Sequence, residues 1–403
     1  MVKFASGITK ESYVDIEGIV IVPDEVCKRA TQQVDIEVRK IYCVGRSANV
    51  LPFSIEDASR SDAEIEKALE VGEQLVHVNQ DTRLNHRVVD LRTQAKQAIF
   101  SVESEVLKLF RQFLWNEDFR EINTPKLTTG TSEGGAAVFT LDYKKQPACL
   151  AQSPQLHKQM AVCGDFGRVF VTGPVFRAED SYTHRHLCEF TGLDVEMRIK
   201  KDYSEVMDLV DRLFVEMFDK LNERCKQELE AINKQYPFKP LKYKPKRLTF
   251  EQGIKMLKDA GFEVDPLGDL NTEMERTLGK LVEEKYGTEF FILHRYPLAV
   301  RPFYTMPCSD NKAYSNAFDV FLRGEEIISG GQRVHSPELL ESRAKECGIN
   351  IKTISTYIDS FRYGAPRHGG FGAGLERVVM LFLNLDNIRM TPMFPRYPGR
   401  LTP

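Results

Sequence analysis

Four side chains in the middle of the chain have the types and the spacing to hold a nucleotide. Arg177 and Glu179 are two residues apart, and His186 and Phe190, four apart, follow after a polar segment. Because alternate residues of a strand share one face, two strands joined by a loop are predicted to present all four to one side. Arg177 and His186 would then bind the α- and γ-phosphates, Phe190 would stack on adenine, and Glu179 would hold an amino group. A hairpin with a surface ion pair has the same pattern, and the pattern alone favours that simpler interpretation.

A glycine-rich run near the end of the chain, residues 370–377, favours the nucleotide site over the surface hairpin. It opens a helix, but no βαβ unit follows it, so it is not a dinucleotide-binding fingerprint. Its glycines would let the backbone lie flat against a ligand. Arg377 falls in the first helical turn, where a cation is disfavoured by the helix dipole. A guanidinium that stacks on an aromatic base would explain its position.

These segments, taken in order, resemble the three motifs of class II aminoacyl-tRNA synthetases. Residues 176–190 resemble motif 2, and residues 372–377 resemble motif 3. A predicted long helix followed by a short strand that ends at Pro125 resembles motif 1, which builds the dimer interface in that family. Motif 1 alone is weak, but the three together are specific, and the class I motifs and the P-loop are absent. The resemblance implies a homodimer with Pro125 at its interface.

The same resemblance implies an ATP site in which two arginines, Arg177 and Arg377, are catalytic. The implied ATP-binding residues are Arg177, Glu179, His184, Arg185, His186, Phe190, Glu326, Gly374 and Arg377.

Further segments resemble the aspartyl-tRNA synthetases of the eukaryotic and archaeal type. Residues 131–135 resemble a mobile lid that is expected to close over the amino acid, and residues 152–158, 190–196 and 329–333 resemble the amino-acid pocket. The implied aspartate-binding residues are Ser132, Glu133, Gln155, Lys158, Asp194, Ser329 and Arg333.

The charges of these residues agree with an acidic substrate. Lys158 and Arg333 supply two cations for a β-carboxylate, which an arginine grips through two hydrogen bonds. Asp194, Gln155 and Ser132 are expected to hold the ammonium group and to orient Lys158. Each charge taken singly is typical of a solvated surface residue. The joint pattern favours a binding pocket.

Two carboxylates, Asp319 and Glu326, flank a predicted turn at residues 323–325. Mg²⁺ prefers carboxylate and phosphate oxygens, and the matching positions of the family bind the metal that accompanies ATP. The alternative is a charged surface hairpin.

The resemblance implies a two-step reaction with ATP, L-aspartate and tRNA-Asp as substrates. The aspartate carboxylate would attack the α-phosphorus of ATP, and the terminal 3′-hydroxyl of the tRNA would then attack the adenylate. Neither step needs a protein nucleophile, so catalysis would come from positioning and charge stabilisation. Two alternatives stay open: an asparaginyl-tRNA synthetase on the same fold, and a synthetase paralogue without catalysis.

The elements that must position these residues indicate an α+β fold with an antiparallel sheet. Apolar residues recur at three- and four-residue steps from Arg92 and predict an amphipathic helix of about six turns. A second long helix is expected over residues 203–232, and strands over 290–293, 316–322 and 326–329. The catalytic domain is predicted to span residues 86–403, with an inserted helical region at about 203–286.

The segment before this domain is predicted to contain two strands and a hinge. Residues 13–20 and 34–44 alternate apolar and polar side chains and predict strands, and residues 53–85 predict a hinge with a short helix capped by Ser61 and Glu64. Residues 1–52 resemble the last part of the OB barrel that binds the anticodon. The resemblance predicts that the first strands of that barrel are missing, so aspartate activation is expected to survive while tRNA charging is impaired.

Composition is consistent with a cytoplasmic enzyme. Of the 403 residues 42% are hydrophobic, and the formal net charge is −3, so a nucleic-acid contact must come from local basic patches. No apolar run is long enough for a bilayer, and the first residues lack a signal-peptide core. The eight cysteines lack zinc-site spacing and are expected to be reduced thiols.

Overall fold

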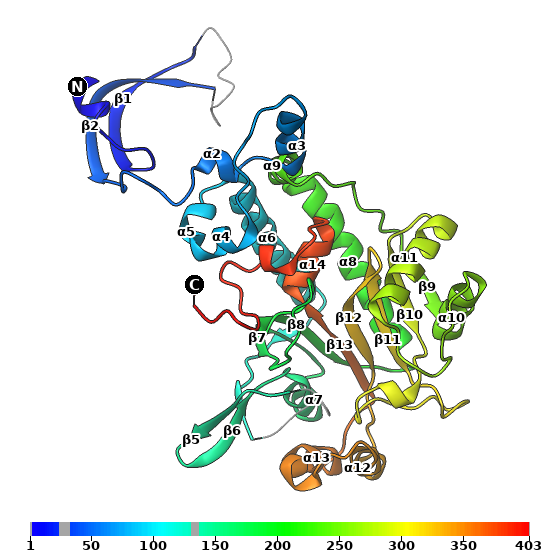
Figure 1. Cartoon of the computed structure of the whole chain (residues 1–403). Coiled ribbons are helices and arrows are strands. Elements are labelled where there is room, and N and C mark those ends of the chain that lie inside the picture. Colours follow the sequence, from blue (N-terminus) through cyan, green and yellow to red (C-terminus); the bar gives the residue numbers. More distant parts are fainter. Residues whose placement is uncertain (1, 24–32, 130–136, 403) are drawn as a thin grey trace. The chain divides into compact units, whose positions relative to one another are not determined.

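The computed structural model describes residues 2–23, 33–129 and 137–402 and divides into two compact units, Met1–Ala58 and Ser59–Pro403 (Figure 1). This boundary falls within the segment that the sequence predicts to be a hinge. No helix in these ranges is long and apolar enough to cross a membrane.

The first unit is built on one antiparallel strand pair, β1 (Tyr13–Ile21) and β2 (Asp35–Gly45), with the short helices α1 (Val2–Ala5) and α2 (Ile55–Ala58). Both predicted strands are confirmed. Their apolar side chains gain little burial, since Ile19 and Ile36 each remain 50% exposed. The described strands therefore form a sheet without a core of its own, and the assignment to an OB barrel stays a prediction.

The second unit begins with three connector helices, α3 (Asp62–Glu70), α4 (Gln80–Asn85) and α5 (Arg87–Asp90). The capping box of α3 forms as predicted: Ser61 accepts from the Glu64 amide, and the Glu64 carboxylate accepts from the Ser61 amide. Both bonds satisfy amides that have no partner within the helix.

A mixed sheet of eight strands forms the centre of this unit, in the order β3-β7-β8-β13-β12-β11-β10-β9. The outer pairs β3–β7 and β9–β10 are parallel and the inner pairs antiparallel, so the predicted α+β class is confirmed. The bounds of its strands are β3 (Arg120–Glu121), β7 (Arg168–Phe176), β8 (Glu189–Arg198), β9 (Lys246–Thr249), β10 (Phe290–His294), β11 (Ala317–Leu322), β12 (Glu325–Gln332) and β13 (His368–Gly374).

Helices α6 (Gln94–Asn116), α8 (Ser204–Arg224) and α14 (Leu375–Phe382) cover one face of this sheet (Figure 1). Their apolar stripes share one core with the inner strands, in which Phe110, Phe218 and Phe371 are fully buried. The long helix from Arg92 is confirmed as α6. The second predicted helix is broken at Cys225, after which α9 (Lys226–Gln235) begins and packs against α6, with Ile232 buried.

The remaining elements surround the sheet. A small sheet contains β4 (Leu127–Thr128), β5 (Thr140–Tyr143) and β6 (Gln146–Leu150). Two further apolar clusters involve helices outside the central core, namely α7 (Gln155–Cys163), α10 (Phe250–Asp259), α11 (Thr272–Tyr286), α12 (Pro337–Glu346) and α13 (Ser355–Arg362). Short 3-10 turns complete the chain at η1 (Leu298–Val300), η2 (Ile351–Ile354) and η3 (Ile388–Met390).

Candidate active site

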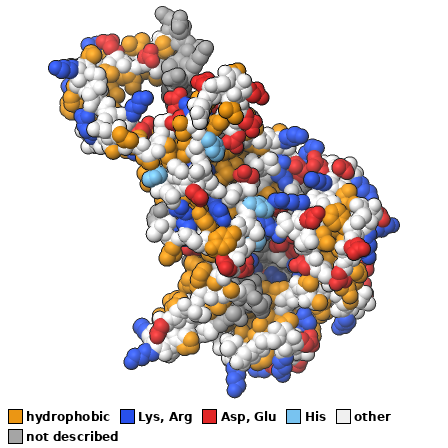
Figure 2. Space-filling model, viewed as in Figure 1, with side chains coloured by type: hydrophobic (Ala, Val, Ile, Leu, Met, Phe, Trp, Pro, Cys, Tyr) orange, Lys and Arg blue, Asp and Glu red, His pale blue; other side chains and the backbone are white. Residues whose placement is uncertain are grey.

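A pocket of about 200 Å³ opens on the sheet where β8, β12 and β13 run side by side. Figure 2 shows a hollow near the centre of the molecule with charged and histidine side chains at its rim. Most of the residues predicted to bind ATP or the amino acid line this pocket: Gln155, Arg177, Glu179, Arg185, His186, Phe190, Asp194, Glu326, Ser329, Arg333, Gly374 and Arg377.

The two glycine-rich and aromatic segments meet at one end of the pocket. Gly374 ends β13, and a Cβ on it would lie 3.7 Å from the Phe190 ring and 3.8 Å from Cβ of Arg377. Arg377 is fixed by its guanidinium, which donates to the carbonyls of Glu326 at 3.0 Å and Arg185 at 3.1 Å. The guanidinium of Arg177 lies over the Phe190 ring at 5.4 Å, so an aromatic face and two guanidinium groups meet at this end of the pocket, a combination that suits a purine nucleotide.

The prediction that two strands carry the residues at this end of the pocket is wrong for three of the four. Strand β7 ends at Phe176 and β8 begins at Glu189, so Arg177, Glu179 and His186 lie in the connecting loop. The loop is held by backbone bonds, including Arg177 N–H to Cys188 O at 2.8 Å, and this folding brings the side chains together. The predicted convergence is observed, but loop geometry produces it.

A cluster of cations surrounds His186. Burial, and then the positive charges of Arg377, Arg185 and Arg177, lower the pKa of His186 to about 4. The imidazole Nδ1 instead forms hydrogen bonds with the hydroxyls of Thr183 and Ser181. Neutral histidine beside three arginines indicates a strongly positive potential, which suits a polyphosphate.

A carboxylate on β12, that of Glu326, also lines the pocket. Burial, and then the nearby Asp319 carboxylate, raise the pKa of Glu326 to about 7. Asp319 itself is paired with Arg301, whose Nη1 and Nη2 lie 2.9 and 2.5 Å from the two carboxylate oxygens. Arg377 and Arg301 offset this only in part, and Glu326 forms no ion pair of the kind that Asp319 has within the described part of the chain, so a divalent cation beside it would compensate its charge.

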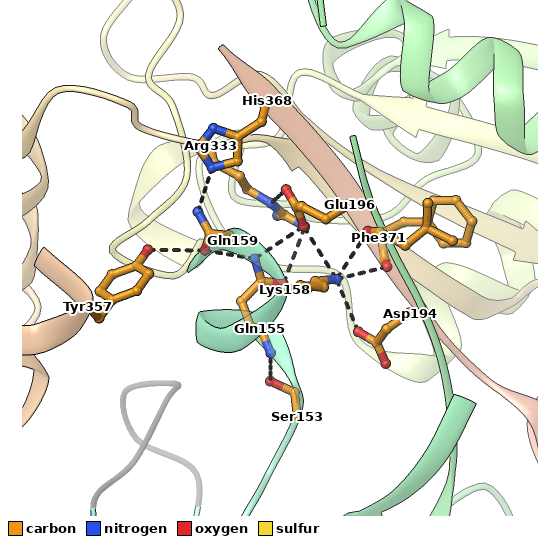
Figure 3. Close-up of polar contacts among 11 residues, drawn as sticks. Ser153, Gln155, Lys158, Gln159, Asp194, Glu196, Arg333, Tyr357, His368 and Phe371 are labelled. Carbon is orange, nitrogen blue, oxygen red and sulfur yellow. Dashed lines mark hydrogen bonds and ion pairs between the residues drawn. The ribbon is translucent and has the colours of Figure 1, made fainter. Parts of the chain in front are cut away.

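The amino-acid end of the pocket is a network of buried charges (Figure 3). Arg333 donates through Nε to Glu196 Oε1 at 3.0 Å and through Nη2 to Glu196 Oε2 at 3.3 Å. Burial alone would raise the pKa of Glu196, but Arg333 and Lys158 hold it below its usual range. No hydrogen bond from Arg333 Nη1 is found within the described part of the chain, so this donor is available to a ligand.

Lys158 is fully buried and does not line the pocket itself. Its ammonium group donates to Asp194 Oδ1 at 3.1 Å and to the carbonyls of Phe371 at 3.0 Å and Val195 at 3.3 Å. The predicted pairing of Asp194 with Lys158 is therefore observed. A Cβ on Gly192 would approach Asp194 Oδ2 to 2.8 Å, so a side chain at that position would displace this carboxylate.

Gln155 and Gln159 extend the network from α7. Gln155 Nε2 donates to Gln159 Oε1 at 2.9 Å, and the Tyr357 hydroxyl donates to the same oxygen at 3.1 Å. Gln159 Nε2 lies 3.0 Å from His368 Nε2, and burial lowers the pKa of that imidazole. These contacts fix the floor of the pocket.

Four predicted residues of the described part of the chain, His184, Lys158, Asp319 and Pro125, are not among those that line the pocket. His184 is outside the pocket lining and pairs with Glu325 Oε1 at 2.8 Å. Ser132 and Glu133, with the predicted lid at residues 131–136, fall outside the described residues. Pro125 is exposed after β3, away from the pocket lining.

The sequence placed Glu196 in a pocket segment without giving it a role, and it did not identify Arg301. Glu196 stands two residues after Asp194 on β8, so strand parity placed both on one face and could have identified it. Arg301 stacks on Tyr296 at 3.8 Å and also donates to Ser329 Oγ at 3.1 Å. It follows a short 3-10 turn, and no sequence pattern pointed to it.

Comparisons with known proteins agree with this geometry. Residues 79–398 match the family model described as tRNA synthetases class II (D, K and N). The chain is 68% identical to aspartate--tRNA ligase 2, cytoplasmic, of Arabidopsis thaliana, covering 100% of this chain and 73% of the relative. It is 52% identical to aspartate--tRNA ligase, cytoplasmic, of Homo sapiens, covering 100% and 80%.

Solved structures show the same fold. An aspartyl-tRNA synthetase from Entamoeba histolytica superposes with a TM-score of 0.92 at 45% identity, covering 100% of this chain and 81% of that one. An asparaginyl-tRNA synthetase from Pyrococcus horikoshii, complexed with asparaginyl-adenylate, gives 0.83 at 30% identity, covering 100% and 86%.

The fold and the match over residues 79–398 make this chain a class II aminoacyl-tRNA synthetase. Within that class it belongs to the aspartate--tRNA ligases, because relatives of that name match its whole length at 52% and 68% identity. The asparagine-specific alternative is not favoured, since the asparaginyl-tRNA synthetase named above is more distant in sequence and in structure.

Proposed function

We propose that this chain activates L-aspartate with ATP and transfers it to the 3′ end of tRNA-Asp, reading the substrate's β-carboxylate through Arg333. The observation that carries the proposal is the fixed guanidinium of Arg333, whose Nε and Nη2 are held by Glu196 while Nη1 stays available. A prepositioned, buried arginine binds a carboxylate at little cost in side-chain entropy.

The second cation, Lys158, supports this reading through Asp194. Its ammonium group holds Asp194 Oδ1 in place, and Asp194 lines the pocket where it would accept from the substrate's α-ammonium group. Gln155 and Ser329 would contribute further contacts, and the predicted contacts of Ser132 and Glu133 lie outside the described residues. Aspartate would thus meet a cation at one end and an anion at the other.

The ATP end is proposed to use the Phe190 ring, Arg377 and the cation cluster described above. The adenine would stack between Phe190 and Arg377, with Glu179 accepting from its amino group. Arg177 would grip the α-phosphate, and Arg185 and His186 the outer phosphates. Arg177 Nε is buried without a hydrogen-bond partner among the described residues, so a phosphate oxygen would satisfy it.

Glu326 and Asp319 are proposed to hold Mg²⁺ together with phosphate oxygens. The bound ion would neutralise negative charge on the phosphates during attack at the α-phosphorus. Arg301 keeps the Asp319 carboxylate oriented, and the Glu326 carboxylate is left for the ion.

With these groups in place, the reaction needs no protein nucleophile. The aspartate α-carboxylate would attack the α-phosphorus in line, forming a P–O bond while the bond to the departing pyrophosphate breaks. Arg177 and Arg377 would stabilise the charge that develops on the α-phosphate. The tRNA 3′-hydroxyl would then attack the carbonyl carbon and release AMP.

The assembly and the compartment are part of the proposal. A homodimer is proposed through α6, β3 and the exposed Pro125, which correspond to motif 1 of the class. A cytoplasmic location is supported by the relatives' names.

Single-turnover chemistry tests the proposal. Enzyme incubated with labelled aspartate and ATP should accumulate bound aspartyl-adenylate, and added tRNA-Asp should receive the label. Absence of adenylate from a folded preparation would contradict the proposal and favour the non-catalytic alternative.

A further inference from the structure

A second pocket, of about 470 Å³, lies between the connector helices, α6, the end of α9 and the segment at 384–390. None of its lining residues belongs to the lining of the active-site pocket. We name it the connector pocket. Its charged lining residues are Arg60, Asp62, His77, Arg83, Arg87, Lys96, Asp386 and Arg389.

Lys96 is the unusual member of this set. Its side chain projects from α6 and is only 2% exposed. No hydrogen bond or ion pair of its ammonium group occurs within the described ranges. The ammonium nitrogen lies 5.5 Å from the centroid of the Tyr236 ring. An unpaired ammonium buried in this way is costly, because desolvation penalises its charge. Burial lowers the pKa of Lys96 to about 7.

The nearest carboxylate is already occupied. Arg83 Nη1 lies 2.8 Å from Asp90 Oδ1, and Arg87 Nη1 lies 2.6 Å from Asp90 Oδ2. Asp90 and Asp386 favour the charged form of Lys96, whereas Arg87 and Arg83 oppose it. Lys96 therefore lacks a carboxylate of its own.

Two further residues of the lining each carry a buried donor without a partner. Gln80 Nε2 and Arg389 Nε are buried and have no hydrogen-bond partner within the described part of the chain. Gln80 Oε1 already accepts from Asn387 Nδ2 at 3.3 Å, so the amide nitrogen is the free end of that side chain. The guanidinium of Arg389 is held over the Tyr397 ring at 4.0 Å.

The charge balance of the lining favours an anion. Four arginines and Lys96 face the lining carboxylates Asp62 and Asp386 and the Asp90 carboxylate that Arg83 and Arg87 share, with His77 and Tyr236 as the remaining titratable groups of the lining. Buried donors that lack acceptors and an excess of positive charge are what a phosphate or sulfate group satisfies.

We propose that the connector pocket binds a small anion with a phosphate-like group, and that Lys96 takes up a proton when the anion binds. The anion supplies the missing counter-charge for the ammonium group and acceptors for Gln80 and Arg389. Binding at this pocket would tie the connector helices α4 and α5 to α6 and to the segment at 384–390. The inference does not depend on which amino acid the enzyme activates.

Titration calorimetry with inorganic sulfate tests this, because sulfate keeps its charge over the range of interest. The active site is first saturated with a non-hydrolysable aspartyl-adenylate analogue. With a Lys96 pKa of about 7, the dissociation constant should be about tenfold lower at pH 6 than at pH 8. At pH 8 the heat should depend on the buffer's ionisation enthalpy, with uptake approaching one proton.

Two variants and a matched control complete the experiment. Lys96→Met should weaken sulfate binding by at least tenfold and abolish proton uptake, whereas Lys258→Met, at an exposed lysine on α10, should change neither. Gln80→Leu should weaken binding while keeping proton uptake, and it decides the question if Lys96→Met fails to fold. Unchanged affinity in both variants, or sulfate binding without proton uptake at pH 8, would overturn the proposal. So would failure of the wild type to bind sulfate.

Discussion

Arg333 and Glu196 form a buried, two-point ion pair at the floor of the amino-acid pocket, with Nε 3.0 Å from Oε1 and Nη2 3.3 Å from Oε2 (Figure 3). The pair neutralises two charges that would be costly alone, and it leaves the Nη1 donor of the guanidinium for the substrate. Glu196 touches no substrate in this account. It is a positioning residue, and the specificity for aspartate depends on the geometry that it imposes.

Replacing Arg333 by leucine should raise the KM for aspartate far more than the KM for ATP. The substrate carboxylate would lose a charged partner in a buried site, a loss of about 2–5 kcal/mol. Steady-state pyrophosphate exchange with each substrate varied in turn measures this. Arg362→Leu, on the exposed side of α13, is the control and should leave both constants unchanged. An unaltered aspartate KM in Arg333→Leu would mean that the pocket is placed wrongly.

Replacing Arg177 by alanine should nearly abolish adenylate formation and leave the fold intact. The variant loses a group that binds the α-phosphate in the transition state, about 3–4 kcal/mol by analogy with a lost oxyanion donor. Exchange rates and a near-UV circular dichroism spectrum check the two parts of the prediction. Activity within tenfold of the wild type would refute the role of Arg177.

His186 should titrate well below neutral pH in the free enzyme and shift upward when ATP binds. Its pKa is lowered to about 4 by burial and by three arginines, and the phosphates would neutralise those arginines. In the folded enzyme His186 stays neutral down to about pH 4, whereas in the unfolded chain it takes up a proton near pH 6.5. The free energy of unfolding should therefore fall as the pH drops from about 6.5 towards 4. NMR of histidine-labelled enzyme with and without ATP measures the shift. A free-enzyme pKa of 6 or above would contradict the described cluster.

Replacing Glu326 by glutamine should raise the Mg²⁺ concentration needed for half-maximal exchange. The variant keeps the shape of the side chain but removes an anionic ligand from the proposed metal site. Replacing Glu325 by glutamine is the matched control, because that neighbouring carboxylate pairs with His184 and Arg276 instead. An equal change of the Mg²⁺ requirement in both variants would show that the effect is structural.

The sequence predicted the elements that follow a local rule. The apolar periodicity of α6, the capping box of α3 and the strands β10 to β12 all depend on near neighbours, and all are confirmed. The break at Cys225 was missed, because it depends on how α9 packs against α6. The resemblance to a family identified the residues of the site, but their arrangement follows from a loop whose backbone path no periodicity describes.

The buried ion pairs were the least predictable part. Glu196 and Arg333 are 137 residues apart, and only the sheet order β8-β13-β12 brings them together. Arg301 and Asp319 likewise meet only after β11 is aligned with the turn at η1. Charged residues are usually exposed, so sequence alone favours the surface for each of them.

Pyrophosphate exchange measured with each of the standard amino acids in turn tests whether the pocket selects aspartate by the charge of its side chain. The reaction reports adenylate formation and needs neither tRNA nor the N-terminal unit. We expect exchange with L-aspartate and negligible exchange with L-asparagine, which lacks the charge that Arg333 is proposed to bind. Exchange with asparagine that equals or exceeds exchange with aspartate would contradict this expectation.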